Sequence, residues 1–474
     1  MPEKTQRIRD PLHNLIEFGA DQFERVMWQV IQTSPFQRLR RVRQLGFSEF
    51  VYPGATHSRF AHSVGVFHTA RRLMKIIERR LVQQDFREHQ AQVALAAALV
   101  HDVGHGMFSH AFEDVGKKLG LKMADHEHVS NMLIRNSEIS EAFKELGGGF
   151  ADDVAKVIGR GRPGNLYDAV VSSQFDADRL DYMQRDRLMS GIQNSGIDFV
   201  WLMANLEIGE VPLGVDNERV GSIETFVLGP KATYAAETYV LALFQLYPTI
   251  YFHKATRAAE KIFTALMMRL ISLIRDGHVE KTGLEKNHPI SCFARDPDEL
   301  GHVVNLDDTV FWGALPMLVD AADPTVKKLA RRLRERRLYK CIDVREDLVS
   351  ELEITPKMPD NKRAPLLKKL ERIVLGIEER LVEWSLKNFK DEPRILIDRT
   401  SRDCYKKFRD SKGPLNQIRI RIGNNILDMA ESSRVVGAVE SFKIFRVYVD
   451  DMDEDAKKMV DSIKKEVVEG DKDA

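Results

Sequence analysis

The segment AQVALAAALVHDVGHGMFSH, residues 91–110, carries the side chains that most clearly could do chemistry. Its apolar run ends at Val100, is too short to span a bilayer and predicts a buried helix. Directly after the run come four potential metal ligands: His101, Asp102, His105 and His110. Burying imidazole and carboxylate groups is costly unless they are paired or bound to a metal. Together they suit a first-row transition metal or Mg²⁺, so the segment predicts a metal site.

A simpler interpretation is a helix C-terminus where the helix dipole favours cationic histidines. The density of ligands, together with acidic and basic residues elsewhere in the chain, favours the metal site. His62 precedes the His101-Asp102 pair and Asp178 follows it, in the run FDADRLDYMQRD. Only a folded helical bundle can bring these distant positions together.

This pattern resembles the HD superfamily of metal-dependent phosphohydrolases, and HDVGHGMFSH resembles its dNTP triphosphohydrolase branch, which includes bacterial dGTPase-like enzymes. The resemblance runs from about Arg7 to Val449 and is strongest over residues 33–186. It implies a divalent metal ion (Mn, Fe, Mg, Zn or Co), which would activate a water molecule and neutralise charge on the attacked phosphate. The implied ligands are His62, His101, Asp102 and Asp178.

The resemblance also implies catalytic roles for three residues near this pair. Glu113 and His126 match an acid–histidine pair that delivers a proton, since a carboxylate keeps an imidazole protonated near neutral pH. His105 would contact phosphate or transfer a proton. Without the resemblance, His126 would be interpreted as a surface residue.

A substrate-binding set follows from the same resemblance. Arg59 and His110 should contact phosphate oxygens, for which the planar guanidinium fork is suited. Gln44-Leu45-Gly46 resembles a turn that packs against deoxyribose and excludes a 2′-hydroxyl. The remaining members of the predicted set are Arg179, Tyr182, Asp186, Tyr247, Tyr251, Lys254 and Arg257.

The terminal phosphate is where this sequence departs from the family. Leu243 stands where vertebrate members have an arginine, so Lys254 or Arg257 would have to replace it. Tyr247, Tyr251 and Lys254 are spaced to share one helical face. Such a face is equally typical of simple packing.

The family has a regulatory nucleotide site at a subunit interface, which implies a homo-oligomer, either dimer or tetramer. Gln37 and Arg40 match this site, and Lys340 would add a phosphate contact. Gln32 occupies the place of an aspartate that reads guanine. We therefore expect an activating nucleotide without assigning its base.

The amino-acid composition limits the size, partners and compartment that we expect for this protein. The chain has 474 residues, 43% hydrophobic and 30% charged, enough for a large catalytic domain with additions. Lys+Arg and Asp+Glu are equal at 71 each, so no bulk charge favours a membrane or nucleic acid. The arginines within 38–43 form a solvated helix face or a phosphate-facing surface, which leaves nucleic acid a weakly supported alternative. Three separated cysteines and no apolar leader predict a cytoplasmic protein.

The elements that position these residues are predicted to be mainly α: an HD-domain helical bundle with small β-hairpins and an appended α+β C-terminal subdomain. We expect a catalytic core at 1–275, a helical extension at 276–394 and the α+β subdomain with a charged tail at 395–474. Residues 35–47 are predicted as one helix, and 147–165 and 276–304 as loops. A kink is expected at Pro248 within a long helical region.

The sequence thus predicts metal-dependent hydrolysis of dNTPs to deoxynucleoside and inorganic triphosphate, under nucleotide regulation. One alternative is an HD phosphohydrolase that acts on a monophosphate, a cyclic nucleotide or an alarmone. Another is a nucleotide sensor with a vestigial site. The complete ligand set favours an enzyme.

Overall fold

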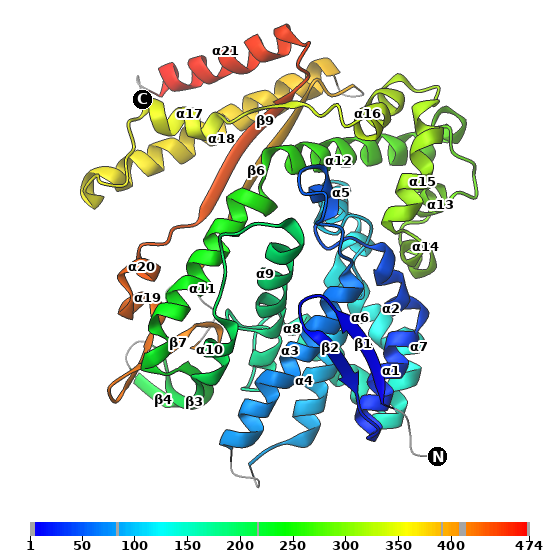
Figure 1. Ribbon diagram of the computed structural model, residues 1–474. Coiled ribbons are helices and arrows are strands. Elements are labelled where there is room, and N and C mark those ends of the chain that lie inside the picture. Colours follow the sequence, from blue (N-terminus) through cyan, green and yellow to red (C-terminus); the bar gives the residue numbers. More distant parts are fainter. Residues whose placement is uncertain (1–4, 82–84, 216–217, 390–391, 407–413, 472–474) are drawn as a thin grey trace. The chain divides into compact units, whose positions relative to one another are not determined.

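The computed structural model describes residues 5–81, 85–215, 218–389, 392–406 and 414–471. Within these ranges the fold is mainly α, as predicted (Figure 1). The chain forms two compact units that interleave along the sequence. The first comprises Met1–Tyr251, Asp296–Trp312 and Asp403–Ser441, and the second Phe252–Arg295, Gly313–Arg402 and Phe442–Ala474. This division differs from the three consecutive domains expected from the sequence, because segments far apart in the chain pack together.

Three helices form the centre of the first unit. Helix α3 (Arg59–Arg80) packs against both α4 (Glu88–Val100) and α9 (Ala177–Ser190). The alanine-rich α4 is buried along most of its length, which allows close helix approach. Ser58 caps α3 by accepting from the Ala61 amide, and Asp176 caps α9 by accepting from the Arg179 amide. The caps fix where α3 and α9 begin, and the predicted metal ligands His62 and Asp178 follow directly.

The other elements of the first unit surround this centre (Figure 1). Its helices are α1 (Gln22–Gln32), α2 (Ser34–Arg38), α5 (His110–Leu119), α6 (His126–Asn136), α7 (Glu138–Phe143), α8 (Phe150–Arg160), α10 (Phe199–Ala204), α11 (Thr233–Leu246), α14 (Leu300–Val304), α19 (Met429–Ser432) and α20 (Arg434–Gly437). The predicted N-terminal hairpin is β1 (Gln6–Asp10) with β2 (Asn14–Phe18).

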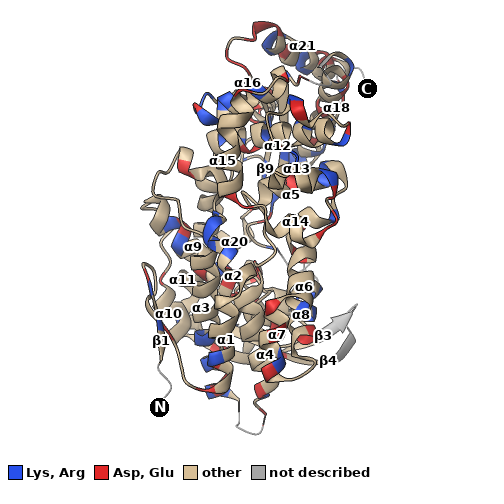
Figure 2. Ribbon diagram, turned by 90° about the vertical axis from the view of Figure 1, so that its right-hand side faces the viewer, with Lys and Arg blue, Asp and Glu red and all other residues tan. Residues whose placement is uncertain are grey.

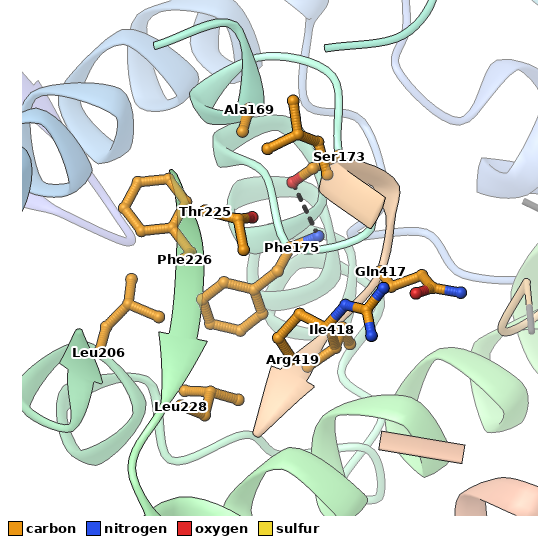
Figure 3. Close-up of a pocket in the computed structure, with 11 residues that line it drawn as sticks. Ala169, Ser173, Phe175, Leu206, Thr225, Phe226, Leu228, Gln417, Ile418 and Arg419 are labelled. Carbon is orange, nitrogen blue, oxygen red and sulfur yellow. Dashed lines mark hydrogen bonds between the residues drawn. The ribbon is translucent and has the colours of Figure 1, made fainter. Parts of the chain in front are cut away.

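A second sheet in this unit has the order β3-β4-β7-β8. The predicted central hairpin forms β3 (Leu206–Val215) and β4 (Glu218–Leu228), and β4 pairs in parallel with β7 (Arg419–Ile422). β7 pairs with β8 (Asn425–Asp428). A cavity of about 10 Å³ lies beside β4 and β7, lined by Phe175, Thr225 and Gln417 among others (Figure 3). It has room for about one water molecule, so it is not a nucleotide site.

The second unit combines helices with a three-stranded sheet of order β5-β9-β6. Its strands are β5 (Lys340–Ile342), β6 (Ile395–Arg402) and β9 (Phe442–Val449); its helices are α12 (Lys254–Arg275), α13 (Pro289–Arg295), α16 (Pro324–Arg334), α17 (Val344–Glu351), α18 (Asp360–Phe389) and α21 (Glu454–Gly470). Helix α15 (Asp308–Val319) begins in the first unit and ends in the second. Buried side chains of α17, α18, α21 and the sheet share one core.

Charge of both signs is mixed along these helices. In Figure 2 the ribbon of α21 is coloured both blue (lysine, arginine) and red (aspartate, glutamate) along its length, in keeping with its sequence. This pattern does not single out a surface for nucleic acid. Among the described helices, none combines the length and the apolar character needed to cross a bilayer.

Three local predictions are wrong. The helix expected over 35–47 ends at Arg38, where a 3₁₀ turn follows and Val42 is extended. Residues 147–165 are not a loop throughout, because α8 buries Phe150, Val154 and Val157 at helical spacing. Residues 276–304 contain α13 and α14, whose buried residues include Ile290 and Val303. Tertiary burial outweighs the local glycines and polar residues in both latter cases.

The expected break at Pro248 is present, with a consequence for the predicted substrate face. A π-helical turn, Tyr247–Tyr251, separates α11 from α12. Such turns arise where the regular hydrogen-bond ladder is interrupted, as proline requires. Tyr247, Tyr251 and Lys254 therefore do not share one continuous α-helical face.

Candidate active site and metal centre

The four predicted metal ligands meet at one place in the first unit. His62 Nε2 lies 3.0 Å from Asp178 Oδ1 and 3.7 Å from Asp102 Oδ2. His101 Nε2 lies 3.4 Å from Asp102 Oδ1 and 3.7 Å from Asp178 Oδ1. Ligand atoms bound about 2.1 Å from one ion lie about 3–4 Å apart, so these separations fit a shared cation. Two imidazoles and two carboxylates are a donor set that first-row metals accept.

The hydrogen bonds of the two histidines fit this assignment. His101 Nδ1 lies 3.0 Å from the Ala98 carbonyl oxygen, which requires a proton on Nδ1. Its Nε2 is buried without a hydrogen-bond partner and can offer a lone pair to a metal. His62 Nδ1 lies 2.9 Å from Asp181 Oδ2, the carboxylate–histidine arrangement typical behind a metal ligand.

Asp181 is held in turn by a buried ion network. Arg185 Nε donates to Asp181 at 2.8 Å and Arg185 Nη1 donates to Asp10 at 2.7 Å. His13 Nε2 lies 2.7 Å from the other oxygen of Asp181. Burial raises the pKa of Asp181, but Arg185 and the histidines outweigh it and hold that pKa well below the usual range. The carboxylate that orients His62 is therefore charged.

Metal binding should release a proton from His62. Burial lowers the pKa of this imidazole, but hydrogen bonds to Asp178 and Asp181 raise it to about 10. At pH 7 the metal-free side chain is therefore protonated, and the ion must displace about one proton to reach Nε2. Metal affinity should rise with pH up to about 10. Calorimetric titration with Mn²⁺ in buffers of different ionisation enthalpy measures the proton count, and heats independent of the buffer would contradict it.

Arg59 and Ser109 border the metal ligands. The Arg59 guanidinium pairs with Asp102 through Nη1 and donates to Ser109 Oγ through Nε at 2.7 Å. Phe108 and Ser109 have φ values of 52° and 55°, an unfavourable region for residues other than glycine. This strained turn directly precedes His110, whose side chain is 65% exposed. Arg59 and His110 thus bracket the site from its buried and open sides.

The predicted proton-delivery residues form a compact cluster. His126 Nδ1 lies 2.5 Å from Glu113 Oε1, and the His126 ring stacks on His105 at 4.0 Å. His105 Nε2 lies 3.3 Å from Asp102, which links the cluster to the metal ligands. Burial lowers the pKa of His126, but Glu113 outweighs it and raises that pKa. Burial, with Arg59 and His126 nearby, lowers the pKa of His105 well below its usual value. The pKa values of the two stacked imidazoles are thus shifted in opposite directions.

Gly104 allows α6 to approach this cluster. A Cβ at this position would overlap the Ser130 amide nitrogen and the His126 carbonyl oxygen. Gly104→Ala should therefore push α6 away and destabilise the fold by about 1–3 kcal/mol. Urea denaturation measures the loss. Gly148→Ala, where a Cβ meets nothing within 4 Å, is the control and should leave stability nearly unchanged.

A second group of polar residues surrounds Asp186. His57 Nε2 lies 2.9 Å from Asp186 Oδ1, and the Tyr251 hydroxyl donates to Asp186 Oδ2 at 2.8 Å. The rings of Tyr182 and Tyr247 pack edge-on against Tyr251. The structure thus brings together predicted substrate residues from α9 and the π-helical turn. Leu45 packs against the same core as these tyrosines.

Two comparisons bear on the family. A family model described as "HD domain" matches residues 59–183, the stretch that contains all four predicted metal ligands. Uncharacterized protein YwfO of Bacillus subtilis is 30% identical over 353 residues, covering 73% of this chain and 75% of that protein. The chain belongs to the HD phosphohydrolase superfamily.

Two further proteins extend the comparison. Deoxynucleoside triphosphate triphosphohydrolase SAMHD1 of Bos taurus is 27% identical over 389 residues, covering 73% of this chain and 60% of that protein. A crystal structure of a phosphohydrolase, BT4208 of Bacteroides thetaiotaomicron, superposes with a TM-score of 0.68 at 23% identity. The superposition covers 94% of this chain and 100% of the phosphohydrolase chain. The two chains share the same fold.

Several predicted residues are engaged by other partners or belong to the second unit. Arg179 bonds to Asp176 and to the Ser173 carbonyl, and lines a cavity of about 40 Å³ with Tyr247 and Leu243. Lys254, Arg257 and Lys340 belong to the second unit. There Arg257 pairs with Asp398 and with Glu260, so its charge is already neutralised.

Three of the predicted regulatory positions, Gln32, Gln37 and Arg40, lie near the surface of the first unit. Gln37 Nε2 donates to the Ile31 carbonyl at 2.7 Å, and its Oε1 accepts from Arg40 Nε at 2.8 Å. Arg40 also lies 3.6 Å over the Phe60 ring, and Gln32 is exposed. Arg40 is thus oriented by its neighbours and still open to solvent.

Sequence reasoning missed three residues that support the HD site. Arg38 is buried and donates to the Val103 and His105 carbonyls at 2.9 and 2.6 Å, so it is not part of a solvated face. His57 contacts Asp186 without any motif to signal it. Asp181 lies three residues after Asp178 on α9, and this helical spacing was the available signal.

Proposed function

We propose that this HD phosphohydrolase hydrolyses deoxynucleoside triphosphates to a deoxynucleoside and inorganic triphosphate. The observation that carries the proposal is the convergence of His62, His101, Asp102 and Asp178 beside the Glu113–His126 pair. Water attacks the α-phosphorus, the bond from phosphorus to O5′ breaks, and O5′ takes a proton. Relatives named as deoxynucleoside triphosphate triphosphohydrolases support this substrate class.

A divalent ion bound by the four ligands would act as a Lewis acid that activates water and offsets phosphate charge. The chain's own residues provide the rest of the reaction. The Arg59 guanidinium, buried between Asp102 and Ser109, is the proposed contact of a phosphate oxygen on the buried side. His110 offers an exposed imidazole on the open side, and phosphate oxygens are acceptors for both groups.

His126 is the proposed proton donor to O5′. Its imidazolium is stabilised by Glu113, and stacking on His105 fixes the plane of its ring. Because its pKa is raised, it holds a proton to higher pH than an ordinary histidine and can deliver it to a leaving alkoxide. His105, held neutral, contacts the phosphate between the metal ligands and His126.

The deoxyribose would lie against Leu45, Tyr182 and Tyr251. Asp186 accepts from Tyr251 and is positioned to accept from a sugar 3′-hydroxyl as well. Gln44, the first residue of the turn 44–46, has a buried Oε1 without a hydrogen-bond partner. A 2′-hydroxyl would need space that the turn 44–46 fills, which gives preference for deoxynucleotides.

The proposal includes nucleotide regulation in a homo-oligomer. Arg40, exposed and oriented by Gln37, is the proposed phosphate contact, with Gln32 near the base and Lys340 as a further contact. Addition of individual nucleotides to a dNTP assay, followed by size measurement of the complex, tests this part. Activation lost in Arg40→Ala, but with unchanged basal turnover, is the expected result.

Product analysis tests the reaction directly. Purified protein loaded with Mn²⁺ should release inorganic triphosphate from dNTPs, with ribonucleotides at least about tenfold slower if the turn excludes the 2′-hydroxyl. Ion-exchange chromatography of each dNTP, alone and in mixtures, separates triphosphate from pyrophosphate and orthophosphate. Release of pyrophosphate or orthophosphate alone would overturn the assignment.

A second candidate is hydrolysis of a nucleotide with a shorter phosphate chain. The neutralisation of Arg257 by Asp398 and Glu260 favours it, since that arginine is not available to a terminal phosphate. Monophosphates, cyclic nucleotides and alarmones in the same assay distinguish the two candidates. Faster turnover of any of these than of every dNTP would favour this second candidate.

A further inference from the structure

Asp308 joins the two loops that border the metal ligands. Its Oδ1 accepts the Phe108 amide at 2.7 Å and its Oδ2 accepts the Arg43 amide at 2.8 Å. The side chain is buried, with 2% of the residue exposed. Asp308 lies in the Asp296–Trp312 segment, which belongs to the first unit although it is flanked in sequence by the second. One carboxylate thus fixes two backbone positions that are 65 residues apart.

Each of these amides lies next to predicted substrate contacts. Arg43 precedes the turn Gln44-Leu45-Gly46, and Phe108 precedes Ser109 and His110. The two loops also touch directly, because Ser109 Oγ donates to the Arg43 carbonyl at 2.9 Å. At Gly46, where φ is +49°, an added Cβ would lie 3.4 Å from the Phe108 carbonyl oxygen. The two loops are therefore closely packed, and the hydrogen bonds of Asp308 hold them at this separation.

The role of Asp308 differs from ordinary helix capping. Asp307, its neighbour, caps α15: Oδ1 accepts from the Thr309 and Val310 amides at 3.0 and 3.2 Å. The other oxygen of Asp307 pairs with the half-exposed Arg41. With the cap supplied by Asp307, both oxygens of Asp308 are directed to the two loops. Phe311, one turn later on α15, packs edge-on against the Phe108 ring at 5.3 Å.

We infer that Asp308 is a positioning residue that holds the sugar-side turn and the phosphate-side loop at the separation catalysis requires. It touches neither substrate nor metal in this role. The effect on sugar selection rests on the proposed function. The effect on the loops themselves does not, because it follows from the backbone hydrogen bonds alone.

Removal of the carboxylate should loosen both loops together. In Asp308→Asn one side-chain acceptor becomes a donor that faces an amide N–H, so one of the two links is lost; Asp308→Ala loses both. Amide hydrogen exchange should accelerate in both segments, 41–46 and 104–110, of Asp308→Ala and in at least one of them in Asp308→Asn. Asp307→Asn makes the same substitution one residue away and keeps a good cap, so it should leave both segments protected.

The kinetic parameters should change in Asp308→Asn and stay near wild type in Asp307→Asn. A displacement of about 1 Å at a reacting group can cost about 100-fold in rate, so Asp308→Asn should lower kcat by about 10- to 100-fold. The ratio of dNTP to ribonucleotide turnover should fall in Asp308→Asn and stay at the wild-type value in Asp307→Asn. Mn²⁺ content should be unchanged in both, since neither residue contacts a metal ligand.

The results separate the inference from the proposed function. Unchanged exchange in either segment of Asp308→Ala, or equal loosening in Asp307→Asn, overturns the inference. Faster amide exchange with an unchanged ratio of dNTP to ribonucleotide turnover overturns the inferred effect of Asp308 on sugar selection. If the wild-type protein hydrolyses no dNTP, the proposed function fails, while faster exchange in both segments would still support the positioning role.

Discussion

His101→Ala combined with Asp102→Ala should lose both bound metal and nucleotide hydrolysis. The two side chains supply a lone pair at Nε2 and a carboxylate to the same centre. A bound ion contributes several kcal/mol to stabilisation of the transition state, so the loss should reach about 10³-fold or more in turnover. Elemental analysis of the purified variant and the triphosphate assay measure the two losses.

Folding must be separated from metal loss, because Asp102 also pairs with the buried Arg59. Removal of one partner of a buried pair is itself destabilising. His101→Ala alone leaves that pair intact and should still lose the metal. His89→Ala, an exposed histidine on the same helix, is the matched control and should retain both metal and turnover. Activity that survives in the metal-free double variant would point to a contaminating enzyme.

His126→Asn should lower kcat by about 10²- to 10⁴-fold and change KM little. Loss of a general acid affects the transition state more than substrate binding. His128→Asn, an exposed histidine two residues along α6, is the matched control and should keep wild-type turnover. Steady-state kinetics with one dNTP measure both. A loss confined to KM would show that His126 binds substrate and does not deliver the proton.

The pH profile gives an independent check on this pair. The Glu113 carboxylate raises the pKa of His126, so the imidazolium persists to higher pH than in an ordinary histidine and is lost as pH rises through that raised pKa. Glu113→Gln removes the charge and should move the alkaline limb of kcat to lower pH, with a partial loss of rate at neutral pH. If the alkaline limb keeps its position in Glu113→Gln, a group other than His126 produces that limb.

Much of the site was determined by the sequence because its signals are local. The His62, His101-Asp102 and Asp178 pattern names the ligand types, and capping residues such as Ser58 and Asp176 fix the helices that carry them. The apolar run before His101 predicts a buried helix, which α4 confirms. The two hairpins and the break at Pro248 also follow from residues close together in the chain.

Other features depend on contacts between distant segments, which no local pattern encodes. Arg38 reads as one arginine in an exposed run, but three carbonyls from distant segments bind it in the interior. His57 meets Asp186, and Asp308 meets Phe108 and Arg43, only after the chain has returned on itself. The interleaving of the two units has the same origin. The sequence by itself determined which groups could bind a metal and move a proton, whereas the tertiary structure decided which buried side chains hold them in place, because burial and partner choice are set by packing across the whole fold.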